Sequence, residues 1–392
     1  MNKRIAFFGS VGYNIGDEAI AVAAAEYLQK NHKNIEIIIS TLQKGVIEGR
    51  YNNLKEFVIN RSSLKGWIRL IKFISSVDIV VIGGGTMVQD KLGISLLRGM
   101  IPYIFQITVL AKILKKPVIT LPIGIDKLNT KLGRFLAKRV LNYFDKLCVR
   151  DEKSMLLANQ YSHRDKTDIL VSADPAFMVG DVVYRDNYNN TSLLHDNFRF
   201  GYVAISLVNE NIKHENYHEA LMESILWILS NTLLGIIFVP MDRRDNEEKQ
   251  VFKRILREIE EIDKSYLSRV EILDSNLLSS VEITNILKNA KLLIAMRLHA
   301  MILSVGYTPI IGISRTTKTE TFLNEFNLPF FDVENYIKPD EFKKVVSQIL
   351  LNDKNSEVNK NLERKRIRAK KVEVIQKTLN QLLDLGCKGI IS

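Results

Sequence analysis

The sequence contains few of the residues that cross-link a chain or bind metal ions. Only two of its 392 residues are cysteines, Cys148 and Cys387, which argues against a disulfide framework and fits a reducing compartment. Eight prolines and 20 glycines are too few for long disordered linkers. No group of His, Cys, Asp and Glu has the spacing of metal ligands, so we expect no essential metal and no cofactor.

Long hydrophobic runs are also absent from the sequence. No stretch reaches about 18 uncharged apolar residues, so we expect no membrane-spanning segment. The start of the chain superficially resembles a signal peptide, but its apolar part is short. Asp17 and Glu18 follow soon after, so a first strand is the better interpretation. These features predict a cytoplasmic protein, with contact at the inner face of the cell membrane left open.

The composition is that of a globular protein large enough for two domains. Hydrophobic residues make up 46% of the chain and charged residues 25%. The net charge is +11, and the segment from Lys360 to Lys388 holds nine basic residues against three acids. Such a surface attracts nucleic acid, anionic lipid or phosphorylated substrates, and charge alone does not separate them.

Strands and helices alternate along both halves of the chain, which predicts an α/β fold of two facing Rossmann-like domains. We expect both sheets to open toward one cleft at the carboxyl ends of their strands. The predicted domains are residues 1–180 and residues 200–356. A polar linker, residues 181–199, joins them, and a basic helix, residues 357–392, follows.

Two glycine-rich loops follow buried strands in the first half. The first contains Gly16, Asp17 and Glu18, and the second is Gly83-Gly84-Gly85, with Gln89 and Asp90 soon after. Glycines at such turns bring backbone N–H groups close to a ligand. The spacing matches neither the dinucleotide fingerprint nor the P-loop, so a tight turn without a ligand is the better explanation for such a loop taken alone.

The first half also places Arg150 and Asp151 where a predicted strand ends. In open α/β sheets this edge binds ligands. The structural alternative is an ion pair at the start of the next helix.

The second half contains the most distinctive stretch, residues 292–306, an apolar run interrupted by Arg297 and His299. A guanidinium binds carboxylate or phosphate through a fixed fork of donors. A neighbouring imidazole can transfer a proton near neutral pH. The stretch therefore predicts a site that binds an anion and moves a proton. The alternative is a histidine bonded to the backbone and an arginine that reaches the surface.

The last segment, about 357–385, is predicted to form one long helix. Its apolar face includes Leu362, Ala369, Val372 and Leu379. Arg364, Lys365, Arg368 and Lys371 occupy the remaining surface. We expect this basic flank to face solvent, with contact to an anionic membrane as the alternative.

Taken together, these pieces resemble the polysaccharide pyruvyltransferase family, and they run along nearly the whole chain. The matching segments are Gly12 to Ala19, Gly83-Gly84-Gly85 with Gln89-Asp90, Val149-Arg150-Asp151 with Ser154, Asp174-Pro175-Ala176-Phe177, and Arg297-Leu298-His299-Ala300.

The resemblance implies a GT-B-like fold and transfer of pyruvate from phosphoenolpyruvate, as donor substrate, to a sugar of a cell-surface polysaccharide. The product is a ketal, and the acceptor sugar is carried on a lipid or a nucleotide. His299 would be the general acid–base, and Arg297 and Arg150 would bind the donor. Lys318 would bind a phosphate of the acceptor's carrier.

The remaining implied contacts are to the acceptor, through the two glycine loops with Asp17, Glu18, Gln89 and Asp90. One segment departs from the family pattern: Ser314-Arg315-Thr316-Thr317-Lys318 keeps the lysine but lacks a tyrosine and a proline.

Two alternatives remain open from the sequence. The first is a GT-B glycosyltransferase that uses a nucleotide sugar, for which Glu282 is the one candidate in a base-and-ribose pocket. The second is a non-catalytic basic protein that binds membrane or nucleic acid. Only charge supports it, since no helix-turn-helix, zinc pattern or aromatic RNA-binding signature is present, and we predict no nucleic-acid partner.

Overall fold

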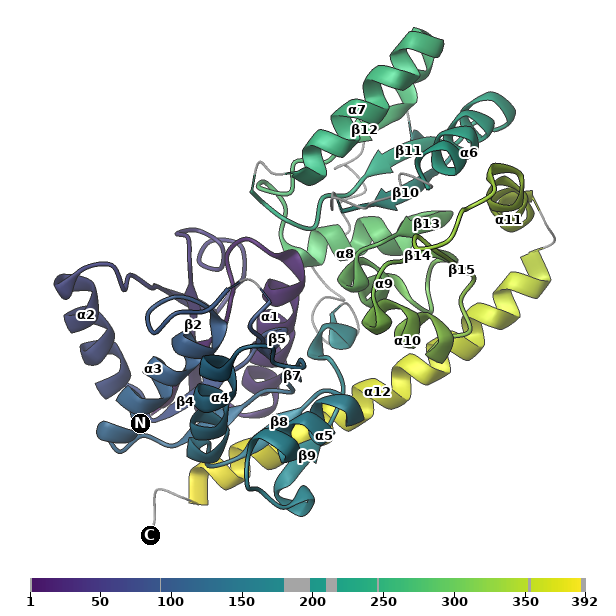
Figure 1. Ribbon diagram of the computed structural model, residues 1–392. Coiled ribbons are helices and arrows are strands. Elements are labelled where there is room, and N and C mark those ends of the chain that lie inside the picture. The colour runs from purple at the N-terminus through teal and green to yellow at the C-terminus, as the bar shows by residue number, and fades with distance from the viewer. Residues whose placement is uncertain are drawn as a thin grey trace. The chain divides into compact units, whose positions relative to one another are not determined.

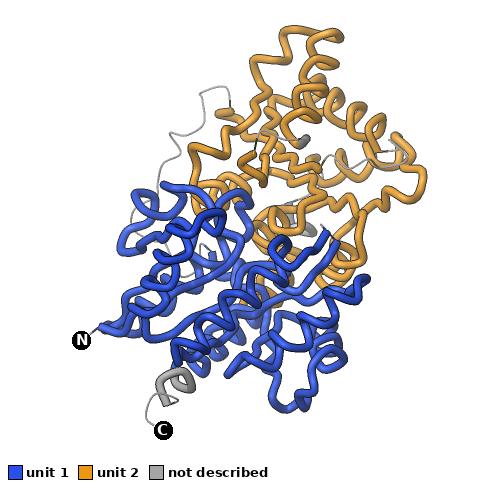
Figure 2. The backbone as a smooth tube through the Cα atoms, turned by 60° about the vertical axis from the view of Figure 1, so that its left-hand side comes forward, with its two compact units in different colours: residues 1–183, 370–392 blue, residues 184–369 orange. Residues whose placement is uncertain are grey.

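The computed structural model describes residues 2–91, 93–179, 198–208, 217–244, 247–351 and 354–388. The chain divides into two compact units (Figure 2). Unit 1 comprises residues 1–183 and 370–392, and unit 2 comprises residues 184–369. Nearly all of the predicted linker, residues 181–199, lies outside the described residues.

Unit 1 is built on a five-stranded parallel sheet in the order β3-β2-β1-β4-β6. Its strands are β1 (Lys3–Phe8), β2 (Ile35–Thr41), β3 (Lys55–Val58), β4 (Ile79–Ile82) and β6 (Val118–Thr120). Two short parallel pairs accompany it: β5 (Thr86–Val88) with β7 (Gly124–Ile125), and β8 (Leu147–Val149) with β9 (Ile169–Val171). All four residues of β4 are buried, as expected for a parallel strand covered on both faces.

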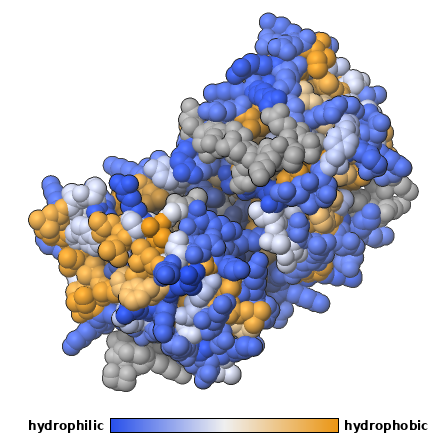
Figure 3. All heavy atoms as spheres, viewed as in Figure 1, coloured by the Kyte–Doolittle hydropathy of each residue, from blue (hydrophilic) through white to orange (hydrophobic). Residues whose placement is uncertain are grey.

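Helices surround this sheet (Figure 1). They are α1 (Ile15–Asn31), α2 (Leu64–Ser75), α3 (Met100–Ile113), α4 (Lys131–Tyr143) and α5 (Glu152–Tyr161), with the 3-10 turns η1 (Lys166–Asp168) and η2 (Pro175–Met178). Apolar side chains gather on the outer surface over α2 and α3 (Figure 3).

Unit 2 has a six-stranded parallel sheet in the order β12-β11-β10-β13-β14-β15. Its strands are β10 (Tyr202–Ser206), β11 (Gly235–Phe238), β12 (Val270–Ile272), β13 (Leu292–Ala295), β14 (Ile310–Ser314) and β15 (Phe330–Asp332). Its helices are α6 (His218–Asn231), α7 (Glu247–Ile262), α8 (Ser280–Asn289), α9 (Leu298–Ser304), α10 (Thr317–Glu325) and α11 (Pro339–Leu351), with the 3-10 turn η5 (Lys264–Arg269).

The strand order identifies where each sheet can bind a ligand. Counted along the chain, unit 2 follows the Rossmann order 3-2-1-4-5-6, and unit 1 follows the same order through its first four strands. The order reverses between β1 and β4 in unit 1, and between β10 and β13 in unit 2. Ligands of open α/β sheets bind at this switch point, beyond the carboxyl ends of the strands.

One predicted helix starts later than expected. The apolar pattern predicts a helix from about residue 94 to 114, but α3 begins at Met100. Gly99 precedes it at φ 110°, a conformation that side-chain-bearing residues avoid. Residues 93–99 therefore form a loop, and this loop lines the pocket described below.

The long terminal helix is present as α12 (Lys354–Lys388), but its predicted solvent-facing basic flank is partly wrong. Arg364 and Arg368 are buried, 4% and 1% exposed. Arg364 donates to the carbonyls of Phe326 and Asn327, and Arg368 donates to those of Ile302 and Val305. A guanidinium is tolerated in the interior when backbone carbonyls accept its hydrogen bonds.

The apolar face of α12 also differs in part from the expectation. Val372 and Leu379 are buried, whereas Leu362 and Ala369 are exposed. Contacts of the helix up to residue 369 belong to unit 2, and those from residue 370 onward belong to unit 1.

Candidate functional site

The glycine loops of unit 1 meet at its switch point. Gly83 N donates to Phe8 O over 2.9 Å, and a Cβ on Gly9 would lie 2.0 Å from Gly83 O. The backbone segments after β1 and β4 therefore pack against each other at a distance that only glycine allows. A ligand at this edge of the sheet would contact backbone atoms of the glycines.

Asp17 lies between these loops at the start of α1. Its carboxylate accepts a 2.6 Å hydrogen bond from Ser10 Oγ, and its Oδ1 would be 2.5 Å from a Cβ on Gly85. Gly85 has φ 71° and Gly84 has φ 110°. Asn14 caps α1 by accepting a hydrogen bond from Gly16 N, so the predicted residues Gly16, Asp17 and Gly83–Gly85 lie together.

Glu18 and Asp90 are buried among partners of their own. Glu18 is inaccessible to solvent and accepts a hydrogen bond from the hydroxyl of Tyr51. Asp90 accepts hydrogen bonds from Asn129 N, Thr130 N and Thr130 Oγ1. Burial acts to raise the pKa of Asp90, but the hydrogen bonds from Thr130 and Asn129 outweigh it and lower the pKa below its ordinary value. Both carboxylates thus organise the loops around the site.

Arg150 follows β8 and its side chain is 10% exposed. Its Nη1 donates to Asp174 Oδ2 over 3.1 Å, and its Nη2 donates to Thr86 Oγ1 over 3.1 Å. Asp151 lies 3.5 Å away and caps α5. The guanidinium is therefore held next to Gly85, with Asp174 balancing its charge.

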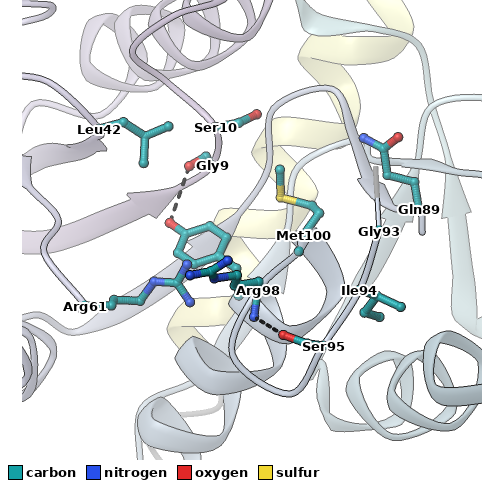
Figure 4. A pocket seen from close by; sticks show the side chains of 12 residues that line it. Gly9, Ser10, Leu42, Arg61, Gln89, Gly93, Ile94, Ser95, Arg98 and Met100 are labelled. Atoms are coloured by element: carbon teal, nitrogen blue, oxygen red, sulfur yellow. Dashed lines mark hydrogen bonds between the residues drawn. The ribbon is translucent and has the colours of Figure 1, made fainter. Parts of the chain in front are cut away.

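A pocket of about 530 Å³ opens in unit 1 beside the loop after β1 (Figure 4). In this view Gly9, Ser10 and Leu42 lie on one side, and Gln89, Gly93 and Ile94 on the other. The remaining lining residues come from the 93–99 loop and from α3, together with one arginine before α2: Ser95, Arg98, Gly99, Met100, Tyr103 and Arg61. This volume suits a small-molecule ligand.

The floor of this pocket combines an aromatic ring with a guanidinium. The Arg61 guanidinium carbon lies 4.7 Å from the centre of the Tyr103 ring, a cation–π distance. The Tyr103 hydroxyl donates to Gly9 O over 3.3 Å, and burial raises the pKa of Tyr103 to about 12. Burial also lowers the pKa of Arg61, so an anion in the pocket would stabilise its charged form.

Sequence reasoning missed Arg61, Arg98 and Tyr103. No motif contains them. Arg98 and Tyr103 lie five residues apart in the chain, and the fold brings Arg61 to Tyr103 from a separate segment. The available signal was compositional: the segment from Phe57 to Phe144 has many cations and few acids.

In unit 2, Arg297 and His299 lie at the switch point, directly after β13. Arg297 is the N-cap residue of α9 and His299 is in its first turn. Both are partly exposed, while residues 292–296 before them are buried. Arg297 and His299 therefore lie at the end of a buried strand, and their functional role stays a prediction.

A buried carboxylate holds Arg297. Nη2 of Arg297 forms an ion pair with Glu248, whose side chain is 1% exposed. Glu248 also accepts hydrogen bonds from Met241 N and Asp242 N. Burial acts to raise the pKa of Asp242, but hydrogen bonds from Arg244 and the charges of Arg244 and Arg297 lower it overall. Glu248, in the first turn of α7, thus fixes the Arg297 guanidinium through an ion pair, and Asp242 in the loop after β11 adds a negative charge nearby.

The other predicted residues of unit 2 lie at neighbouring helix starts. Lys318 is in the first turn of α10, which Thr316 caps, and Arg315 just before it is partly buried, which lowers its pKa. Glu282, the candidate for nucleotide binding, instead closes the capping box of α8 with Ser279. No cluster of three or more His, Cys, Asp and Glu residues that could hold a metal occurs among the described residues.

The two Rossmann-like sheets define a GT-B-like α/β fold, and solved structures confirm it. A UDP-GlcNAc 2-epimerase from Methanocaldococcus jannaschii has a TM-score of 0.60 at 15% identity, with 94% of this chain and 99% of that chain covered. Anabaena Alr3699/HepE in complex with UDP-glucose has a TM-score of 0.59 at 10% identity, covering 97% and 99%. At such identities the likeness shows the fold alone.

The family is shown by sequence. A sequence model of the family described as polysaccharide pyruvyl transferase matches residues 14–315, which include both glycine loops, Arg150, Arg297 and His299. The chain belongs to this family and is an enzyme of the pyruvyl transferase type, as the sequence predicted. No curated protein matches the chain significantly.

Proposed function

We propose that this chain transfers the pyruvyl group of phosphoenolpyruvate onto two hydroxyls of a sugar, forming a ketal and releasing phosphate. The observation that carries the proposal is the pair Arg297 and His299 at the switch point of unit 2, with the guanidinium held by Glu248. Family membership supplies the reaction class, and the pair supplies the groups that this reaction needs.

His299 is the proposed general acid–base. It gives a proton to the methylene carbon of phosphoenolpyruvate, which becomes a methyl group and leaves the neighbouring carbon electrophilic. A sugar hydroxyl attacks that carbon and returns a proton to the imidazole. The bond from carbon to the phosphate oxygen then breaks, and phosphate leaves with the bonding electron pair. The second hydroxyl attacks the resulting cation, passes its proton to the departing phosphate and closes the ketal. A histidine suits both proton transfers because it titrates near neutral pH.

Arg297 is the proposed contact for the donor's carboxylate and for the departing phosphate. Glu248 fixes its orientation, so the donors are aimed before charge develops, which is how a preorganised group lowers a barrier. Arg150 is proposed as a second donor contact, since Thr86 and Asp174 orient its fork beside the Gly83–Gly85 loop. Lys318 is proposed to bind a phosphate of the acceptor's carrier.

Unit 1 is proposed to bind the acceptor. Backbone amides of the two glycine loops, Asp17 and Gln89 face the sugar, and Glu18 and Asp90 hold the loops in place. The pocket lined by Arg61 and Tyr103 would bind the phosphate-bearing part of the carrier, because a guanidinium held beside an aromatic ring can bind phosphate.

The test is incorporation of label from phosphoenolpyruvate, with phosphate release measured in parallel, across sugars linked to nucleotides and to lipids. His299→Ala should lower turnover by about 10²–10⁴-fold, the contribution of a general acid–base. His163→Ala, at an exposed position in unit 1, is the control and should match the wild type. Near-normal turnover of His299→Ala would remove the imidazole from the mechanism, and absence of phosphate release with every acceptor would reject pyruvyl transfer.

A further inference from the structure

The surface of unit 1 around α2 and the 93–99 loop is both apolar and strongly basic. Between Phe57 and Phe144 the sequence has fourteen lysines and arginines and three acids. This segment therefore has a net charge of +11, equal to that of the whole chain.

None of the three acids opposes this charge at the surface of α2. Asp78 accepts a hydrogen bond from Arg4 N, Asp90 is buried at the start of α4, and Asp126 is buried and lies 3.4 Å from Lys91. The cations of α2 therefore face no acid of this segment.

Helix α2 has two apolar faces. Leu70, Phe73 and Ile74 are buried in the core. A second stripe, Leu64, Ile68 and Ile71, is exposed, and Leu64 has 79% of its surface accessible. Residues spaced by four and three lie one above another on a helix, so this stripe is continuous. Lys65, Arg69 and Lys72 form a parallel stripe beside it, and all three are exposed.

The 93–99 loop presents two more apolar side chains beside a cation. Ser95 N donates to Arg98 O, and Arg98 N donates to Ser95 Oγ, which closes a tight turn. Leu96 and Leu97 form its tip and are 68% and 72% exposed, with Arg98 exposed next to them.

Gln106 of α3 joins this turn to the start of α2. Its Nε2 donates to Leu96 O over 3.2 Å, and its Oε1 accepts from Arg61 Nη1 over 2.7 Å. The two features thus belong to one surface, where Figure 3 shows apolar side chains gathered over α2 and α3.

We infer that this surface, consisting of Leu64, Ile68, Ile71, Lys65, Arg69, Lys72 and the Ser95–Arg98 turn, docks on an anionic phospholipid bilayer. Adjacent apolar and basic stripes are the pattern of a helix that lies in the membrane interface. A second copy of the chain fits poorly, because a symmetric contact would set the basic stripe of one copy against that of the other. No helix among the described residues is long and apolar enough to cross a bilayer, so the contact is peripheral.

Docking has a consequence for the choice of acceptor carrier. This consequence rests on the proposed function, whereas docking itself does not. Ser95 and Arg98 of the docking turn also line the pocket of unit 1. An acceptor sugar carried on a lipid diphosphate would then meet the pocket at the membrane surface, which favours a lipid over a nucleotide as carrier.

Binding to vesicles tests docking without any substrate. The full chain should cosediment with vesicles of equal parts phosphatidylglycerol and phosphatidylcholine, and bind pure phosphatidylcholine at least about tenfold more weakly. Leu96→Ser/Leu97→Ser should lower the partition coefficient at least about tenfold. Lys65→Gln/Arg69→Gln/Lys72→Gln should lower it about a hundredfold, at about fivefold per cation.

Matched variants elsewhere serve as controls. Leu233→Ser/Ile262→Ser removes leucine and isoleucine side chains of unit 2 that are 62% and 58% exposed. Arg366→Gln/Lys370→Gln/Lys377→Gln removes exposed cations of α12. Both should bind vesicles like the wild type. Loss of binding only in the α12 variant would overturn the inference in favour of that helix, and no binding by the wild type would overturn it outright.

The two tryptophans give an independent readout of the docking face. Trp67 is on α2 and Trp227 is on α6. Brominated lipid should quench the fluorescence of Trp227→Phe, which retains Trp67, and leave that of Trp67→Phe unchanged. The reverse pattern would refute docking through α2. A dimer that dissociates in Leu96→Ser/Leu97→Ser, without vesicle binding by the wild type, would identify the surface as a self-interface instead.

Discussion

Arg368→Met is the sharpest test of how the chain stabilises the helix that carries His299. Helix α9 has seven residues and its N-cap residue, Arg297, makes no side-chain capping bond. Isolated helices this short do not form stably in water. Arg368 donates to Ile302 O over 2.7 Å and to Val305 O over 3.4 Å, and so caps the opposite end of α9 with a positive charge.

The magnitude follows from these contacts. Hydrogen bonds to a charged group contribute about 1.5–3 kcal/mol each, and a cation at a partly buried helix C-terminus contributes up to about 2 kcal/mol. The second bond is long, and methionine restores part of the packing over Tyr307, whose ring centre lies 5.2 Å from the guanidinium carbon. We therefore expect a loss of about 3 kcal/mol in the free energy of unfolding of unit 2.

The assay is urea unfolding followed by the fluorescence of Trp227, in a Trp67→Phe background so that the signal reports unit 2. Arg366→Met, at an exposed position two residues earlier, is the control and should change stability by less than about 0.5 kcal/mol. Equal midpoints for Arg368→Met and Arg366→Met, at unchanged slope, would refute the capping role.

Three further predictions concern the two sites. Glu248→Gln should lower kcat/KM for phosphoenolpyruvate by about tenfold or more, because Arg297 loses its buried ion-pair partner; an unchanged kcat/KM would contradict the orienting role. Gly85→Ala should destabilise unit 1 by about 1–3 kcal/mol in thermal unfolding, since φ is 71° and the new Cβ would lie 2.5 Å from Asp17 Oδ1. Gly45 also has a positive φ but has open space around it, so Gly45→Ala should lower the free energy of unfolding by less. The pKa of Asp90 is lowered in the folded state, so its carboxylate stabilises the fold at pH values above the ordinary pKa of 3.8, and this contribution is lost as the pH falls through the folded-state pKa. Asp90→Asn should therefore flatten the acid limb of a plot of unfolding free energy against pH. An identical acid limb would show that Asp90 does not contribute to it.

Several features could be predicted from the sequence because they depend on local patterns. Continuous apolar runs such as Ile79–Ile82 predict buried parallel strands, and the alternation of strands with helices predicts two Rossmann-like sheets. Arg297 and His299 were identifiable because polar groups in an apolar run are costly unless they have a function or a partner.

Other features depend on tertiary contacts that no local pattern encodes. Asp90 was selected as a substrate contact, yet three donors from residues 129 and 130 surround it. Arg364 and Arg368 have the sequence context of a solvated basic flank, but the carbonyls that accept their bonds belong to segments about 40 to 70 residues earlier. The pocket is likewise assembled from separate segments around Tyr103.

The buried arginines show that part of the chain's positive charge stabilises the fold. Arg368 caps α9, whose first turn contains His299, and Arg364 caps α10, whose first turn contains Lys318. Two of the cations in α12 thus stabilise the helices that present His299, the proposed general acid–base, and Lys318, the proposed phosphate contact. Buried charges of this kind are not available to a membrane. The cations of α2 are exposed, lie beside exposed apolar residues and face no acid from their own segment. The exposed charge on α2 is therefore a part of the total that an anionic surface can reach together with apolar side chains.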